Sequence, residues 1–200
     1  MRDEILLLSE EDIQGILEPG MVISIVESVF KSLSLKTPIL PPITRLTVDD
    51  PANNFFLTLP SALPGYPFSH GNLILVCYIR TGSPIAITGA STITAMRTAG
   101  GHAVIAAKYL SKKNPKVLAV IGCGNQAKAG IRGFLSQFDT LEQISIFDSF
   151  ESSMNSIHAL FGDGIRIVSK DTPGDAIKDA DIVLTVSTAK DIQIRPEMVK

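Results

Sequence analysis

The sequence predicts an α/β protein whose second half is a parallel, doubly wound sheet. A fully apolar run at residues 117–121 leads directly into a glycine-rich turn, and the turn opens a segment with helical spacing. The same alternation continues along the chain, through strands and helices predicted at 126–138, 143–147, 150–161, 165–168, 173–180 and 182–186. Strands that alternate with helices pair in parallel, because each helix carries the chain back across the sheet.

The first half of the chain predicts an α+β arrangement. Residues 5–8 form a short apolar strand, and Ser9 with Asp12 gives the capping-box pattern of a helix start. Apolar residues at helical spacing predict a second, amphipathic helix over 21–33. The remaining elements are strands expected at 45–48, 55–59, 73–79 and 85–87 and a long helix at 91–110. These elements favour an antiparallel sheet with helices against it.

The pattern changes near residues 111–114, which predicts a boundary between domains at 1–112 and 113–200. The second domain has four predicted strands, and Pro196 is typical of the first residue of a further helix. A complete sheet of this type has about six strands. We therefore expect an incomplete domain that is truncated at its C-terminus.

The turn after the first buried strand has the pattern of a Rossmann-type dinucleotide-binding corner. Gly122 allows a tight turn, Gly124 lets the main chain approach a diphosphate, and Ala127 stands where only a small residue lets helix and strand pack. The free N–H groups and the positive end of the helix dipole then face the anion. We interpret Cys123 as a small filler, although a helix N-terminus could lower its pKa.

The next strand ends at Asp148, which lies roughly 20 residues past the glycines, where the pattern places a ribose partner. A carboxylate accepts hydrogen bonds from both ribose hydroxyls and repels a 2′-phosphate, and residues 149–152 contain no Arg or Lys. NAD is therefore favoured over NADP. Alternatively, Asp148 caps the helix that begins near Phe150, and the two roles can coexist.

Composition and charge argue against several classes of function. A net charge of −2 and a pI of about 5.9 do not indicate a basic, nucleic-acid-binding surface. No apolar run is long enough for a membrane span. Cys77 and Cys123 lack metal-ligand spacing, so we expect no metal site and interpret both as reduced thiols of a cytoplasmic protein. His102 and His158 are interpreted as packed or inert residues, and a general-base role for His70 is a minor alternative.

Three segments resemble the ornithine cyclodeaminase/mu-crystallin family of NAD(P)-dependent amino-acid and imine enzymes. Residues 59–65 are similar to the family's "MPAYLPG", residues 93–99 to its "LTALRTAA" and residues 122–127 to its "GxGxQA". The likeness covers nearly the whole chain, and the second and third segments together are specific, because "RTA" ahead of "GxGxQA" is not general to dinucleotide-binding folds. The resemblance implies that residues 1–112 bind substrate and form a homodimer through their sheet, and that residues 113–200 bind NAD.

The resemblance also implies roles for individual residues. Arg97 would lie between the substrate carboxylate and the cofactor as the catalytic and substrate-binding arginine, and Arg45 would be a second carboxylate clamp. Taken alone, Arg45 is equally a surface strand residue that pairs with Asp49 or Asp50. Besides the glycine turn and Asp148, the implied cofactor contacts are Asn125 and Gln126 at the diphosphate, Thr98 in support, Thr185 and Ser187 on the nicotinamide side, and Ser69.

The implied activity is hydride transfer at the Cα–N bond of a small amino acid or a cyclic imine, by deamination, cyclodeamination or imine reduction. Two family features are missing. No Lys lies in residues 66–71, where members carry a "GxKxV" strand, and the family's Asp beyond the fourth sheet strand is absent. The alternative is therefore a catalytically impaired member that binds NAD or another small ligand.

Overall fold

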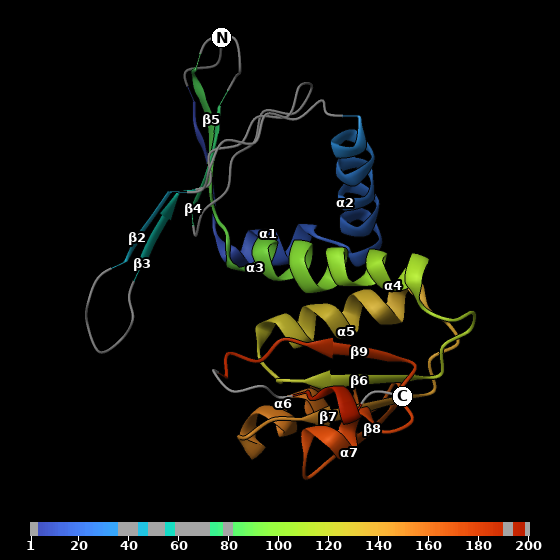
Figure 1. Ribbon diagram of the computed structural model, residues 1–200. Coiled ribbons are helices and arrows are strands. Elements are labelled where there is room, and N and C mark those ends of the chain that lie inside the picture. Colours follow the sequence, from blue (N-terminus) through green and yellow to red (C-terminus); the bar gives the residue numbers. More distant parts are fainter. Residues whose placement is uncertain are drawn as a thin grey trace. The chain divides into compact units, whose positions relative to one another are not determined.

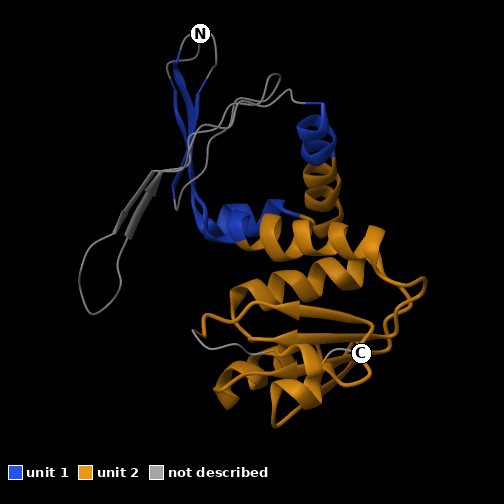
Figure 2. Cartoon of the chain, in the orientation of Figure 1, with its two compact units in different colours: residues 1–17, 28–94 blue, residues 18–27, 95–200 orange. Residues whose placement is uncertain are grey.

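The computed structural model describes residues 4–35, 44–47, 55–58, 73–77, 82–189 and 194–198. Contacts group the chain into two units, one of residues 1–17 and 28–94 and one of residues 18–27 and 95–200 (Figures 1 and 2). This grouping places residues 95–112 in the second unit, because the helix there packs against residues 125–137. The division into domains at 1–112 and 113–200 stays a prediction.

A four-stranded parallel sheet forms the centre of the second unit. Its strands are β6 (Val117–Ile121), β7 (Gln143–Phe147), β8 (Arg166–Ser169) and β9 (Ile182–Thr185), in the order β8-β7-β6-β9. The chain starts at the inner strand β6, moves outward through β7 and β8, and then returns to pair β9 with the other side of β6. This is the strand order of the first part of a Rossmann sheet, as predicted.

Helices cover both faces of this sheet (Figure 1). On one face lies α5 (Asn125–Gln137), whose Gly130 meets Leu184 of β9. The other face carries α6 (Glu151–Phe161) and α7 (Pro173–Ile177), and α7 packs its Ala176 and Ile177 on Ala119 and Ile121 of β6. The short 3₁₀ helix η2 (Pro196–Met198) begins at the predicted proline. The predicted doubly wound architecture is therefore confirmed.

The long helix predicted at 91–110 is three consecutive elements. They are α3 (Ser91–Ala95), the π-helix η1 (Met96–Ala103) and α4 (Val104–Leu110). The π-helix is pressed onto α5 at small residues, since a Cβ on Gly133 would collide with the carbonyl oxygen of Gly100. Helical spacing of apolar residues does not distinguish an α-helix from a π-helix, and π-helical turns occur frequently at functional sites.

The amino-terminal part of α2 (Pro19–Ser34) belongs to the same unit. Val26 lies against η1, where a Cβ on Gly101 would be 3.0 Å from its Cγ2. The next residue, Glu27, accepts hydrogen bonds from Lys108 Nζ at 3.1 Å and from the Tyr109 hydroxyl at 2.5 Å. The helix predicted at 21–33 is thus present, and its apolar and acidic side chains fasten it to η1 and α4.

The first unit contains a mixed sheet rather than the expected antiparallel one. Its strands are β1 (Leu6–Leu8), β4 (Leu73–Cys77) and β5 (Pro84–Gly89), in the order β1-β5-β4. β4 and β5 are antiparallel, but β1 pairs in parallel with the distant β5. Local strand patterns do not encode this long-range pairing. β2 (Thr44–Thr47) and β3 (Phe55–Thr58) form a separate antiparallel pair.

The predicted capping box starts α1 (Glu10–Ile16). Ser9 Oγ accepts the N–H of Asp12 at 3.1 Å, and Asp12 Oδ2 accepts the N–H of Ser9 at 2.8 Å. Glu10 then caps a second helix, because its carboxylate accepts the N–H groups of Ser91 and Thr92 at 2.8 and 2.9 Å. These bonds lower the pKa of Glu10 and join α1 to the start of α3.

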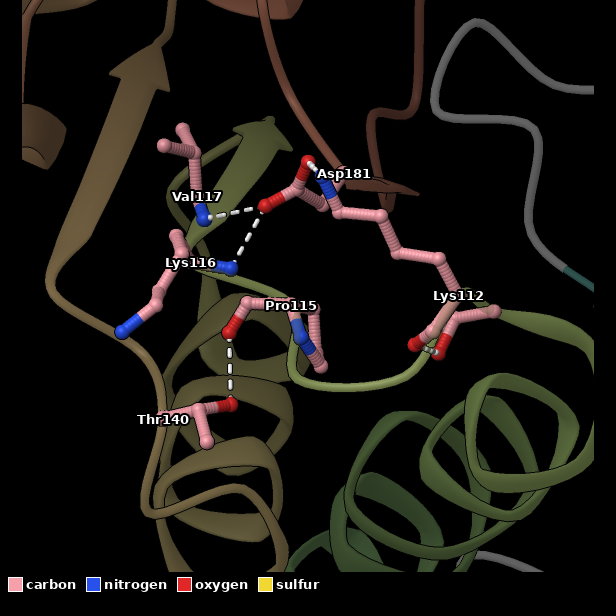
Figure 3. A network of polar contacts seen from close by, with 7 residues as sticks. Lys112, Pro115, Lys116, Val117, Thr140 and Asp181 are labelled. Carbon is pink, nitrogen blue, oxygen red and sulfur yellow. Dashed lines mark hydrogen bonds and ion pairs between the residues drawn. The ribbon is translucent and has the colours of Figure 1, made fainter.

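At the amino edge of the parallel sheet, Asp181 holds two strands in register (Figure 3). Its Oδ2 accepts the N–H of Lys116 at 2.5 Å and of Val117 at 3.0 Å, and its Oδ1 forms an ion pair with Lys112. Thr140 donates to the Pro115 carbonyl at 2.7 Å nearby. The starts of β6 and β9 are therefore tied together, and their carboxyl ends reach the same opposite edge.

Candidate functional site

A cavity of about 340 Å³ opens at the carboxyl edge of the parallel sheet. Its walls come from the segments that follow three strands, namely residues 121–124 after β6, 147–150 with Ser153 after β7, and 186–189 after β9. Ligands of open α/β sheets bind outside the carboxyl ends of the strands, where the strand order reverses. The site between β6 and β9 is that position in this sheet, because the chain leaves β6 in one direction and returns to it on the other side.

Gly122 shapes the floor of the cavity. Its φ of +94° lies in the region that side chains disfavour. A Cβ on this residue would also lie 2.8 Å from the N of Ser187 and 2.9 Å from the carbonyl carbon of Val186. The turn after β6 therefore packs directly on the segment after β9, and only glycine fits there.

Gly124 has the opposite surroundings. It is exposed, its φ is −81°, and a Cβ there would have no neighbour within 4 Å. As the N-cap of α5 it provides no side-chain hydrogen bond to the first turn of that helix. The main chain at Gly124 thus borders open space at the start of α5, where an anionic group can approach the helix terminus.

Asp148 connects the wall after β7 to the glycine turn. Its Oδ2 accepts the N–H of Cys123 at 2.7 Å, and its Oδ1 accepts the N–H of Phe150 at 2.9 Å. The bond to Phe150 lies one residue before α6, whose N-cap Phe150 provides no side-chain cap, so Asp148 supports the turn ahead of the helix and does not cap the helix itself. A carboxylate has about four acceptor positions, so both oxygens can still accept hydrogen bonds from a ligand.

Cys123 is a buried thiol in this turn. It is 1% exposed, and burial, together with the negative charge of Asp148, raises its pKa to about 12. The expectation that the helix N-terminus could lower this pKa is therefore wrong, because loss of hydration outweighs the helix dipole. Its role as a small filler agrees with its burial.

Arg97 and Thr98 are half-buried residues of the π-helix η1. The Nε of Arg97 is enclosed by the protein and has no hydrogen-bond partner. Burial lowers the pKa of Arg97, and burial followed by the charge of Arg97 lowers the pKa of His102. A buried guanidinium nitrogen without a partner is unfavourable, so this position favours an anionic ligand.

The other predicted residues are distributed unevenly around the cavity. Ser187 lines it directly, whereas Thr185, the last residue of β9, is exposed outside the wall. Asn125 and Gln126 are the first two residues of α5, and Gln126 Oε1 is enclosed without a partner. Ala127 is fully buried under the helix. Arg45 lies on β2, and Ser69 and His70 lie outside the described residues.

Several wall residues were not singled out from the sequence. Ser149, Phe150 and Ser153 follow β7, and Thr188 and Ala189 follow β9. Phe150 is 71% exposed, which is unusual for an aromatic ring. Their position after strands that were predicted correctly is the signal that could have found them.

The described ranges contain no group of three or more His, Cys, Asp or Glu side chains placed to hold a metal ion. No single helix among these residues is long and apolar enough to cross a membrane. Together, α1 and α2 have the length and composition of a membrane span, but the chain bends by 90° between them.

Both cysteines are free thiols. His158 Nε2 contacts Ser169 Oγ at 2.8 Å.

Comparison with known proteins identifies the family. The model of the ornithine cyclodeaminase/mu-crystallin family matches residues 62–200, which is more than half of the chain. The chain belongs to the ornithine cyclodeaminase/mu-crystallin family. The resemblance stated from three short segments is thereby confirmed.

Proteins similar to this chain have the names of different enzymes. N-((2S)-2-amino-2-carboxyethyl)-L-glutamate dehydrogenase of Staphylococcus aureus is 35% identical over 52% of this chain and 32% of its own length. The structure of Thermococcus litoralis Δ1-pyrroline-2-carboxylate reductase, in complex with NADH and L-proline, is 25% identical with a TM-score of 0.88. An archaeal alanine dehydrogenase dimer with bound NAD is 23% identical with a TM-score of 0.86.

The chain spans only part of these relatives. The two structural matches cover 98% of this chain, but 66% of the reductase and 64% of the alanine dehydrogenase.

Proposed function

We propose that the cavity at the carboxyl edge binds NAD and that the protein transfers a hydride at the Cα–N bond of a small amino acid or cyclic imine. The observation that carries this proposal is the turn between β6 and α5. Only glycine fits at position 122. Gly124 leaves open space before a helix start that has no side-chain cap. These are the two features that a diphosphate requires of such a turn.

The residues present fit the dinucleotide. The diphosphate would lie against Gly124 and the first N–H groups of α5, with Asn125 and Gln126 beside it. Asp148 would accept the hydroxyls of the adenosine ribose, and Ser187 would line the nicotinamide side. The cofactor supplies the exchangeable hydride when it is bound. NADP is less suited, because its 2′-phosphate would meet the carboxylate of Asp148.

Arg97 would provide the charge for the substrate carboxylate. The cost of its buried, unpaired Nε is offset when an anion binds, and a guanidinium can hold a planar carboxylate with two parallel hydrogen bonds. Arg45 and Thr98 remain proposed contacts to substrate and cofactor. Holding the carboxylate fixes the direction of the Cα–H bond, and an error of about one ångström costs on the order of a hundredfold in rate.

A fluorescence titration with NADH, followed by addition of L-proline and L-alanine, tests the proposal. We expect NADH to bind, and Arg97→Ala to weaken amino-acid binding far more than NADH binding. Equal losses would count against the carboxylate role, and absence of NADH binding would reject the proposal. Binding of both ligands without turnover would support the second candidate, an impaired member, which the absence of Lys from residues 66–71 favours.

A homodimer formed through the sheet of the first unit belongs to the same proposal. Leu7, Ile87 and Leu75 lie next to one another across β1, β5 and β4, on one face of that sheet. Leu7 is 72% exposed and Leu75 is 45% exposed. Contiguous exposed apolar side chains of this kind mark interaction surfaces.

Sedimentation of two matched variants tests the dimer. Leu75→Asp should convert a dimer to a monomer, because it places a charge in the apolar face. Leu160→Asp is the control, since Leu160 is 44% exposed but lies in the second unit. A wild-type protein that sediments as a monomer at micromolar concentration would contradict the proposed dimer.

A further inference from the structure

An aromatic side chain stands exposed in the wall of the cavity. Phe150 is 71% exposed, and it lies in the wall segment that follows β7, close to Asp148. Phenylalanine is usually buried, because its ring is excluded from water. Phe147, the other aromatic residue of this wall, packs against the core cluster formed by α7 and β6. Phe150 therefore offers the cavity a flat apolar surface, which the described residues leave largely open to solvent.

The main chain fixes the position of Phe150 before any ligand binds. Its N–H donates to Oδ1 of Asp148 at 2.9 Å. Its carbonyl oxygen accepts the N–H groups of Ser153 at 3.0 Å and Met154 at 3.4 Å, in the first turn of α6. The ring thus projects from a main-chain position that is held by the carboxylate to which the ribose is assigned. A side chain held in this way loses little freedom when a ligand packs on it.

The two flanks of the cavity suit different parts of a dinucleotide. β7 and β9 pair with opposite sides of β6, so Phe150 and Ser187 belong to opposite flanks. In the proposed function, Asp148 accepts the hydroxyls of the adenosine ribose, and Ser187 lines the nicotinamide side. The adenine is bonded directly to that ribose. It would therefore lie on the β7 flank, where Phe150 is the exposed aromatic residue.

We propose that the ring of Phe150 stacks on the adenine of the cofactor and makes the β7 flank a purine-binding subsite. The faces of both rings are flat, and an aromatic side chain accepts any base, since every base has such a face. The proposal rests on the proposed function, because it takes the ribose at Asp148 as given. It adds that Phe150 contributes to affinity for the adenosine half of the cofactor, independently of the nicotinamide half.

Calorimetric titration of the full chain with ADP-ribose and with NAD tests this proposal without reference to activity. ADP-ribose contains the adenine, both riboses and the diphosphate, but no nicotinamide. Phe150→Ala should bind both ligands about tenfold more weakly, the usual effect of removing an aromatic ring from a stacked base. Its melting temperature should stay near that of wild type, because the ring is exposed. An unchanged affinity for ADP-ribose would overturn the subsite.

Matched variants distinguish stacking from general apolar contact. Phe150→Tyr keeps the flat ring and should bind ADP-ribose like wild type. Phe150→Leu keeps an apolar side chain without the ring, so most of the loss seen in Phe150→Ala should persist. Leu160→Ala is the control, since Leu160 is 44% exposed on the same helix but does not line the cavity. Full affinity in Phe150→Leu would reject the stacking.

Fluorescence locates the adenine directly. The chain contains no tryptophan, so Phe150→Trp introduces a single indole as a reporter. We expect ADP-ribose to quench the indole of Phe150→Trp, because the adenine would lie on its face, whereas the indole of Leu160→Trp should not respond. Binding of ADP-ribose to Phe150→Trp without quenching overturns the adenine subsite alone. Failure of the wild type to bind either ADP-ribose or NAD overturns the proposed function with it.

Discussion

The main-chain N–H of Cys123 donates a hydrogen bond of 2.7 Å to Oδ2 of Asp148. This bond joins the glycine turn after β6 to the end of β7. The second oxygen of the same carboxylate accepts the N–H of Phe150 at 2.9 Å. Asp148 is thus held in place by the main chain before any ligand arrives, and a group held in its binding position loses little freedom when it binds.

Removal of the Asp148 carboxylate should affect both stability and cofactor choice. Asp148→Ala leaves the N–H of Cys123 without its partner, so we expect a loss of about 1–3 kcal/mol in the free energy of unfolding. NADH should bind more weakly, and the preference for NADH over NADPH should shrink because the repelling charge is gone. Chemical denaturation and titrations with both cofactors measure these effects. Asp171→Ala, at an exposed position, is the control. An unchanged NADH-to-NADPH ratio would reject the ribose role.

Substitutions of the two glycines of the turn should have different effects: one on stability and the other on NADH binding. Gly122→Ala should destabilise the fold by about 2 kcal/mol or more, because it combines a positive φ with a collision against Ser187. Gly124→Ala meets no atom of the protein and has an ordinary φ, so its melting temperature should stay near that of wild type. It should still weaken NADH binding, because the new methyl group occupies the open space. Normal NADH affinity in Gly124→Ala would show that the diphosphate lies elsewhere.

The thiol of Cys123 should be unreactive in the native protein. With a pKa of about 12, only about one thiol in ten thousand is ionised at pH 8, and the side chain is 1% exposed. Cys77 is only partly buried and serves as the internal comparison. We expect a disulfide reagent to modify Cys77 first and Cys123 only after denaturation. Rapid native modification of Cys123 in a Cys77→Ser variant would contradict the arrangement of the turn.

Asp181 should make stability depend on acid pH. Burial acts to raise its pKa, but the bonds from Lys112, Lys116 and Val117 prevail, and its pKa is lowered from 3.8. A carboxyl group with a lowered pKa in the folded state stabilises the protein above its ordinary pKa. That stability is lost as the pH falls through the lowered value.

Asp181→Asn tests this dependence. At pH 7 the variant should lose about 1 kcal/mol, given that the group lies near the solvent. Below a pH of about 4 the difference from wild type should shrink. Denaturation curves recorded from pH 7 to pH 3 provide the measurement. A difference that stays constant over this range would mean that the charge of Asp181 contributes nothing.

Much of the nucleotide-binding half could be predicted because its signals are local. The strand predicted at 117–121 is β6 with the same bounds, and the one at 143–147 is β7. Buried parallel strands are continuous apolar runs, and a glycine turn ends the first one. The helix at 126–138 differs from α5 by one residue at each end, which is within the usual uncertainty of helix termini.

The first half was predicted less completely because its pairings are not local. Each strand of the mixed sheet was expected, but the parallel pairing of β1 with β5 joins residues about 80 positions apart. The π-helix that carries Arg97 has the same kinds of residues as an α-helix, and its form accompanies close packing on α5. Residue spacing predicts neither the pairing of β1 with β5 nor the π-helical form of residues 96–103.

The sequence by itself determined the order of strands and helices, the position of the glycine turn and the family, because these depend on neighbouring residues and short motifs. The tertiary structure alone decided that Gly122 meets Ser187, that Asp148 holds the N–H of Cys123, and that Arg97 Nε and Gln126 Oε1 are enclosed without partners. The physical reason is that each of these relationships joins segments that meet only when the sheet and its helices have packed.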